Sequence, residues 1–141
     1  MVKQTPLDGR GDSPSFFSYS LSGERQQLLW KGEPGLQDII GSTDGPWIAT
    51  VRTVNQLPFE QWKLILHNSE TGAEVQVAES QPGIIGVAGL PIGLPLGVAP
   101  LPQVGGGKVV WSQWEHSGDG AAKVMYGFDI ASGLTKELAR A

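Results

Sequence analysis

Cysteine is absent from this chain of 141 residues, so neither disulfide bonds nor thiolate metal sites can form. Basic residues are few: ten lysines and arginines are scattered among fourteen acidic residues, and the formal net charge is −4. Because nucleic-acid binding requires a clustered basic patch, this distribution argues against a nucleic-acid partner. The two histidines, His67 and His116, have no serine or carboxylate at a spacing that defines a catalytic triad. We therefore predict a protein that is not an enzyme and that holds no metal and no cofactor.

The start of the chain lacks the apolar segment of a secretory signal, because a polar run at residues 8–15 follows almost directly. Glycine and proline, in contrast, are abundant, with 20 and 10 copies. This composition is typical of a fold with many turns and argues against long helices. A hydrophobic fraction of 40% suffices for one compact core. We expect an all-β protein.

A unit of strand, tight turn and strand occurs three times, at residues 16–29, 63–78 and 123–139. Each copy has a hydroxyl residue directly before a glycine, which supplies the positive φ that a tight turn requires. An apolar residue follows five positions later. The turn glycines are Gly23, Gly72 and Gly133, and the apolar residues are Leu28, Val77 and Leu138. A hairpin that recurs at long spacing indicates a repeat fold.

The interval from Gly72 to Gly133 is longer than that from Gly23 to Gly72, and an insertion explains the difference. Residues 80–107 carry no charge and include five prolines and eight glycines. Without part of this stretch, both intervals approach the ~40–50 residues of a four-stranded propeller blade.

Two turns that open onto apolar strands precede the second and third hairpins. Residues 42–45 (Ser-Thr-Asp-Gly) lead to Ile48 and Ala49, and three glycines at 105–107 lead to residues 108–114. Here the chain resembles the TolB-like β-propeller family, whose blades start with a Ser-Pro-Asp-Gly-type turn and end with an Asp-x-x-Thr-Gly-type hairpin. Residues 69–72 and 129–133 match the second element. Thr43 replaces the usual proline, and the turn at 105–107 lacks the aspartate.

This resemblance implies antiparallel four-stranded blades of an incomplete or oligomer-completed β-propeller. We expect a flexible segment at 1–14 and propeller-like repeats over 15–141. The repeats divide into a closing hairpin (15–34), a blade (35–79), the apolar insertion (80–107) and a second blade (108–141). Asp44 and Gly45 join the three hairpin glycines as structural turn residues.

The resemblance further implies a non-catalytic protein- or ligand-binding or scaffolding module, in a family often found in the periplasm or outside the cell. One alternative is a propeller segment of a larger hydrolase of the prolyl oligopeptidase type. A closed propeller needs at least four blades, and this chain provides about two and the closing hairpin of another. We therefore expect a fragment of a longer polypeptide or an assembly with copies of itself, with a smaller β-sandwich or open barrel as further alternatives. The expected partner is another protein or a second copy, rather than nucleic acid or a membrane.

The apolar insertion is long enough to attract attention as a membrane segment, but its proline density argues against a spanning helix. Three interpretations remain open. The segment packs over the sheet faces, it forms an exposed interaction loop, or it dips into a membrane interface.

A second functional alternative comes from Arg10, Gly11 and Asp12, which with the following Ser-Pro resemble the integrin-binding loops of adhesion proteins. In such a loop a guanidinium and a carboxylate lie on either side of a glycine, and the carboxylate completes a metal site on the receptor. The other interpretation is a chance tripeptide in an entry loop.

The five tryptophans include two, Trp111 and Trp114, that we predict on the first strand of the last blade. Aromatic residues commonly fill the space between blades, and exposed ones can instead form a platform for sugars or peptides. A Trp111→Ala variant separates the two roles, since loss of folding indicates core and loss of binding alone indicates a site.

Overall fold

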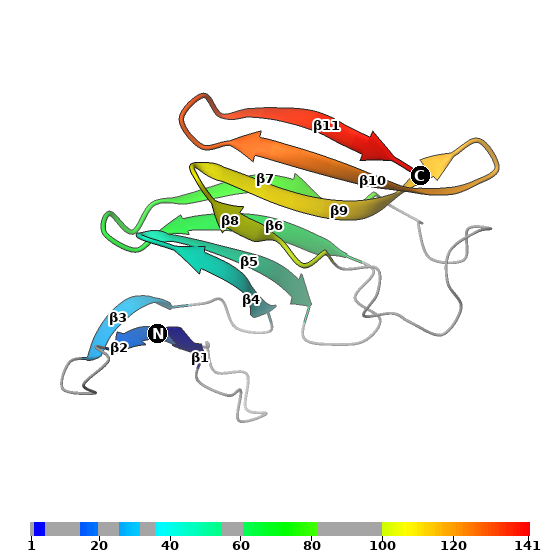
Figure 1. Cartoon of the computed structure of the whole chain (residues 1–141). Helices are drawn as coiled ribbons and strands as arrows, with labels where there is room; N and C mark the ends of the chain where they lie inside the picture. The colour runs from blue at the N-terminus through cyan, green and yellow to red at the C-terminus, as the bar shows by residue number, and fades with distance from the viewer. Residues whose placement is uncertain (1, 5–14, 20–25, 32–35, 55–60, 82–99) are drawn as a thin grey trace.

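The computed structural model describes residues 2–4, 15–19, 26–31, 36–54, 61–81 and 100–141, and this part of the chain consists of strands and turns. It forms three sheets in which neighbouring strands are antiparallel (Figure 1). The expected all-β fold with antiparallel four-stranded sheets is confirmed, and the sheets do not close into a ring. No helix in the described ranges could span a membrane.

The N-terminal sheet contains β1 (Val2–Gln4), β2 (Ser15–Tyr19) and β3 (Gln26–Lys31). The middle sheet contains β4 (Leu36–Asp44), β5 (Trp47–Val54), β6 (Trp62–Asn68) and β7 (Glu74–Glu79). The C-terminal sheet contains β8 (Gln103–Gly105), β9 (Lys108–Ser117), β10 (Gly120–Asp129) and β11 (Leu134–Arg140). In each sheet the spatial order follows the chain order, so each is a simple meander. The first strand of the C-terminal sheet, β8, lies within the range 80–107 that the sequence marks as an insertion.

A β-bulge recurs in the last hairpin of every sheet. In the middle sheet the pairing shifts between Leu64 and Ile65, which leaves Val77 as the extra residue on β7. In the C-terminal sheet the shift lies between Met125 and Tyr126, and the extra residue is Leu138. The β2–β3 hairpin also has a shift, between Phe16 and Phe17, and its extra residue is Leu29, one position further along than in the other two hairpins. An extra residue bends a strand and increases its twist, and the bulges at Val77 and Leu138 lie at the same distance from their turn glycines.

We call two residues equivalent when their separation equals that between Gly72 and Gly133. The two bulges in the four-stranded sheets are equivalent by this definition, and so are several backbone hydrogen bonds outside the strand ladders. The bond from Gly72 N to Asn68 O (2.8 Å) is equivalent to that from Gly133 N to Asp129 O (2.8 Å). The bond from Ser69 N to Pro46 O (2.8 Å) is equivalent to that from Ile130 N to Gly107 O (3.0 Å). The bond from Ser80 N to Trp62 O (3.0 Å) is equivalent to that from Ala141 N to Lys123 O (2.9 Å). The middle and C-terminal sheets are therefore two copies of one unit.

The two copies also share the side-chain chemistry of the last turn. Asn68 Oδ1 accepts hydrogen bonds from Glu70 N (3.0 Å) and Thr71 N (3.2 Å), and Asp129 Oδ1 accepts from Ala131 N (2.9 Å) and Ser132 N (3.2 Å). Gly72 and Gly133 close these turns with φ of 75° and 72°. A short polar side chain that bonds the backbone two and three residues ahead is a strong local specification of a turn.

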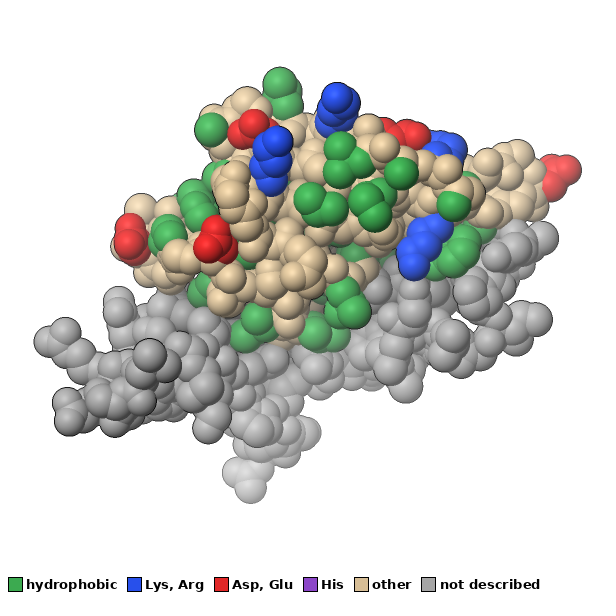
Figure 2. All heavy atoms as spheres, viewed as in Figure 1, with side chains coloured by type: hydrophobic (Ala, Val, Ile, Leu, Met, Phe, Trp, Pro, Cys, Tyr) green, Lys and Arg blue, Asp and Glu red, His purple; other side chains and the backbone are tan. Residues whose placement is uncertain are grey.

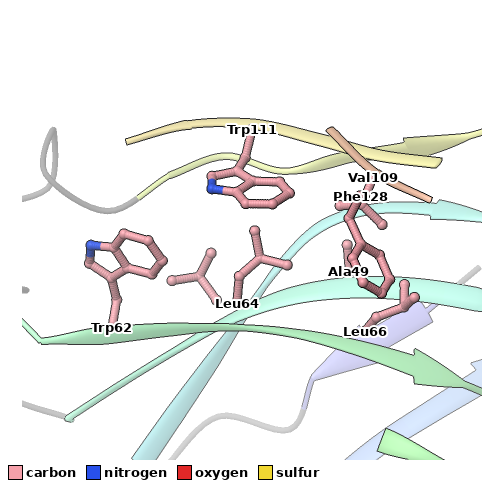
Figure 3. Close-up of a cluster of buried hydrophobic side chains, with 8 residues drawn as sticks. Ala49, Trp62, Leu64, Leu66, Val109, Trp111 and Phe128 are labelled. Atoms are coloured by element: carbon pink, nitrogen blue, oxygen red, sulfur yellow. The ribbon is translucent and has the colours of Figure 1, made fainter. Parts of the chain in front are cut away.

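The middle and C-terminal sheets stack face to face, and the N-terminal sheet lies at the other end of the stack (Figure 1). Between the two four-stranded sheets, Trp62, Leu64 and Leu66 of β6 point toward Trp111 of β9 and Phe128 of β10 (Figure 3). Ala49, Val51 and Val109 complete this buried cluster. The alternation of strand side chains explains it, because every second residue of β9 from Val109 to Glu115 is buried.

The first strands of the two stacked sheets approach each other closely. Ser42 Oγ on β4 accepts a hydrogen bond from Val104 N on β8 at 2.6 Å. A Cβ added to Gly41 would stand 2.6 Å from Cγ of Pro102, so only glycine permits this contact. Pro100 and Pro102, at the described end of the apolar insertion, are buried, whereas Leu101 is 74% exposed.

Candidate functional site

The residues that the sequence singles out for binding do not form one site. Arg10, Gly11 and Asp12 lie outside the described residues, as does Gly23. Trp111 is 3% exposed and belongs to the core between the sheets. Trp114 is half-buried on the opposite face of β9.

Asp44 and Gly45 lie in the exposed turn between β4 and β5, where Gly45 has a φ of 57°. Gly72 lies in the β6–β7 turn and Gly133 in the β10–β11 turn, and all three turns lie at the same end of the strands (Figure 1). The three glycines therefore allow the backbone to turn tightly between consecutive strands.

A network of charged side chains lies on the face of the middle sheet that is turned away from the C-terminal sheet. Asp38 of β4 is 1% exposed and binds Arg52 of β5 through two hydrogen bonds, Nε to Oδ1 at 2.8 Å and Nη2 to Oδ2 at 3.1 Å. A third Arg52 nitrogen, Nη1, donates to Glu74 Oε1 of β7 at 2.8 Å. The hydrogen bond that Arg52 donates to Asp38 raises the pKa of Arg52 further above its usual range, against the opposing effect of burial.

His67 of β6 lies beside the Glu74 end of this network. Its Nε2 is 3.0 Å from Thr50 Oγ1, and its Nδ1 is 3.6 Å from Glu74 Oε2. Burial lowers the pKa of His67 from its ordinary value of 6.5, despite the nearby carboxylates of Glu74 and Asp38. Burial would raise the pKa of Glu74, but the Arg52 hydrogen bond and charge hold it below 4.5.

A second network runs along the covered face of β9. Trp111 Nε1 donates to Gln113 Oε1 at 2.8 Å, and Gln113 Nε2 donates to Glu115 Oε2 at 2.9 Å. The hydroxyl of Tyr126 on β10 donates to the same Glu115 oxygen, and its ring stacks on Trp111 with a centroid distance of 5.6 Å. Burial and this hydrogen bond raise the pKa of Tyr126 to about 12, so the phenol stays protonated at neutral pH. Arg140 of β11 lies 3.7 Å from Glu115.

Both networks place ionisable groups in hydrogen bonds that join strands of one sheet. Asp38 and Glu74 are tied by Arg52, and Glu115 is tied by Gln113 and Tyr126. Within the described ranges, no three or more histidine, aspartate or glutamate side chains gather as a metal site would require. These charge networks hold strands in register, because Asp38, Arg52 and Glu74 lie on three different strands and Tyr126 joins β10 to Glu115 of β9.

Neither network was expected from the sequence. Asp38 and Arg52 stand within strands whose neighbours are apolar, such as Ile39 and Val51. A charge inside an apolar strand is itself a signal of a buried pair, since a lone buried charge is costly. The sequence does not indicate which charges meet, because the pairing depends on strand register.

The turn between β9 and β10 lies at the other end of the strands (Figure 1). His116, Ser117, Gly118 and Asp119 are all exposed, and the turn extends beyond the neighbouring strands (Figure 1). Its base is held by a hydrogen bond from His116 N to Gln81 Oε1 at 2.7 Å. It thus combines a fixed base with an open polar tip, as recognition loops commonly do.

Comparison with protein-family models, with curated proteins and with solved structures finds no match to this chain.

Proposed function

We propose that this chain is a non-catalytic binding or scaffolding module built from β-propeller blades of the TolB-like type. The observation that carries the proposal is the repetition of one four-stranded unit in two stacked sheets, with equivalent bulges and equivalent turn hydrogen bonds. Propeller blades are four-stranded meanders arranged around a centre. The close approach of β4 and β8, the first strand of each sheet, supports this arrangement because first strands line the centre of a propeller.

A binding role is supported by where the ionisable side chains lie. The buried ones among the described residues bond to each other across strands, as Asp38 does to Arg52 and Glu115 to Tyr126. Exposed polar groups lie on the turns and on the outer strands β7 and β11, and the β9–β10 turn, exposed from His116 to Asp119, extends beyond the neighbouring strands (Figure 1). We assign recognition to this turn, with the stacked sheets as its rigid support.

The test is a binding screen of the purified, labelled chain on arrays of peptides and of oligosaccharides. The wild type is compared with a double variant of the β9–β10 turn, His116→Ala with Asp119→Ala. The matched control is Glu70→Ala, which changes an exposed side chain on a turn at the opposite end of the strands. Circular dichroism verifies that all three proteins fold alike.

We expect a discrete set of array members to bind the wild type and the Glu70→Ala control, and to lose binding by the β9–β10 variant. Binding that both turn variants lose equally would contradict the assignment to this turn. The absence of any bound peptide or oligosaccharide, or turnover of an array member by the wild type, would contradict the proposed class of function.

A further inference from the structure

The outer face of the C-terminal sheet is the face turned away from the middle sheet, and we define it by the side chains of Val110, Trp114, Met125 and Leu138. Val109 and Trp111 face the core, so their neighbours on β9 point the other way. Leu138 covers Gly127 on this face, since a Cβ there would lie 3.3 Å from Cδ1 of Leu138. Met125 is 41% and Leu138 50% exposed.

Figure 2 shows hydrophobic side chains interspersed with lysine, arginine and acidic side chains on the side of the molecule formed by the C-terminal sheet. Exposed large hydrophobic side chains that gather on one face commonly mark a surface that meets a partner. This mixture of apolar and charged groups is typical of an interface whose two surfaces are exposed to water when the partners are apart.

The repeat reveals how this face is used when a partner sheet is present. The residues equivalent to Val110, Met125 and Leu138 in the middle sheet are Ala49, Leu64 and Val77. Ala49 and Leu64 are each 0% exposed, because the C-terminal sheet covers them, and Val77 packs against the same cluster. The same positions of one repeated unit are thus buried in one sheet and open in the next.

We propose that the outer face of the C-terminal sheet is an interface, and that it binds the N-terminal sheet of a second copy of this chain. This inference rests on the proposed propeller-blade class. The facing sides of the middle and C-terminal sheets already cover each other, and the N-terminal sheet stands at the opposite end of the stack (Figure 1). Its β2–β3 hairpin also contains a β-bulge, and its sequence is the first copy of the repeated hairpin unit, so it supplies a third member of the repeat.

The size of a closed ring identifies a dimer. The described part of each chain contributes three sheets, so two copies contribute six, within the roughly four to eight blades of β-propellers. Three copies would exceed that range. The contact joins two different surfaces, and such head-to-tail contacts form closed rings when the rotation permits.

The first test is the molar mass of the full chain, measured by light scattering after size exclusion. We expect a mass of about 30 kDa for the wild type, twice the 15.0 kDa of one chain. The double variant Met125→Glu with Leu138→Glu should fall to the mass of one chain, with an unchanged circular dichroism spectrum because both side chains are exposed in the monomer. Leu101→Glu, at a more exposed apolar position outside β10 and β11, should remain dimeric.

The second test identifies the surfaces that meet. The absence of native cysteine allows single-cysteine variants at Met125, and separately at Ser18 and Tyr19 of β2. These two β2 positions are successive, so they belong to opposite faces of the N-terminal sheet. A mixture of the Met125→Cys chain with one of the β2 variants should give mixed cross-linked dimers with a bismaleimide.

Each outcome has a distinct meaning. A folded wild-type monomer, or cross-linking of Met125→Cys only to itself, would overturn the proposed docking. Either result would leave the binding module standing, because that proposal depends on the covered faces and the β9–β10 turn. Loss of array binding in an intact dimer would instead contradict the proposed function alone.

Discussion

At the scale of single residues, the buried charge of Asp38 requires a partner of opposite charge. A carboxylate that is 1% exposed would lose several kcal/mol of solvation if it had no partner. The planar guanidinium of Arg52 matches its two oxygens with two hydrogen bonds. Such a pair adds little stability compared with a pair of well-packed apolar residues. It does fix β4 and β5 in one register, because any slip would separate the charges.

Replacement of Arg52 by methionine should therefore lower the free energy of unfolding by ~3–5 kcal/mol, since it leaves Asp38 buried without its cation. Urea denaturation followed by tryptophan fluorescence measures this change. The matched control is Glu137→Gln, which removes an exposed partner of Arg140 and should cost no more than ~1 kcal/mol. Equal losses in the two variants would show that Asp38 does not depend on Arg52.

His67 makes the stability of the fold depend on pH. Its pKa in the folded chain lies below its ordinary value of 6.5, so the unfolded chain binds a proton more readily than the folded chain. Stability should fall as the pH drops below about 6.5, by up to about 1.4 kcal/mol per pH unit. The lowered pKa of Glu74 adds a further loss as the pH falls below about 4.5.

The variant His67→Gln should have a flatter dependence of unfolding free energy on pH between 7 and 5. Denaturation midpoints across this range measure the slope, and His116→Gln, at an exposed turn, should keep the slope of the wild type. A wild-type slope in His67→Gln would mean that another group carries the pH dependence.

At the scale of elements, the hairpin turns explain why the repeat is visible in the sequence. Asn68 and Asp129 each bond two backbone amides ahead of them, and a glycine with positive φ closes each turn. All of these contacts lie within six residues, so local chemistry alone specifies them. The bulges fall at Val77 and Leu138, the apolar residues that recur five positions after these glycines, but the bulge itself forms only by pairing with the neighbouring strand.

Substitution of Gly133 by alanine should lower the free energy of unfolding by ~1–2 kcal/mol. The cause is backbone strain, because φ is 72° and a Cβ at this position meets nothing within 4 Å. Gly133→Asn should restore part of the loss, since asparagine tolerates this conformation better. Thermal unfolding measures both variants.

Gly105→Ala is the control for Gly133→Ala: its added Cβ also meets nothing, and its φ lies outside the positive region. It should stay within ~0.5 kcal/mol of the wild type. A similar loss at both positions would assign the effect to something other than the turn.

At the scale of the whole molecule, stability depends on the apolar layer between the middle and C-terminal sheets. Trp62 and Trp111 enter this layer from opposite sheets (Figure 3), and each tryptophan buries ~150–250 Å². The face of β9 that covers the middle sheet is apolar at one end and polar from Gln113 to Glu115. The polar end is satisfied by hydrogen bonds, so the layer combines packing with a defined register.

Trp111→Ala should lower the free energy of unfolding by ~3–5 kcal/mol, because it opens a cavity in this layer and removes the indole donor to Gln113. Leu101→Ala, at a side chain that is 74% exposed, is the control and should be nearly neutral. Loss of binding without loss of stability in Trp111→Ala would mean that the indole belongs to a recognition surface instead of the core.

The sequence by itself determined the strand content and the hairpins of this protein, because the turns at Gly72 and Gly133 are specified by residues adjacent in the chain. It also indicated that Trp111 belonged to strand β9. Only the tertiary structure decided that Asp38 meets Arg52 and that Trp111 faces Trp62, since those partners are far apart in the chain and come together through strand register and sheet stacking. For the same reason the open face of Met125 and Leu138 could not be predicted: exposure depends on which sheets pack together.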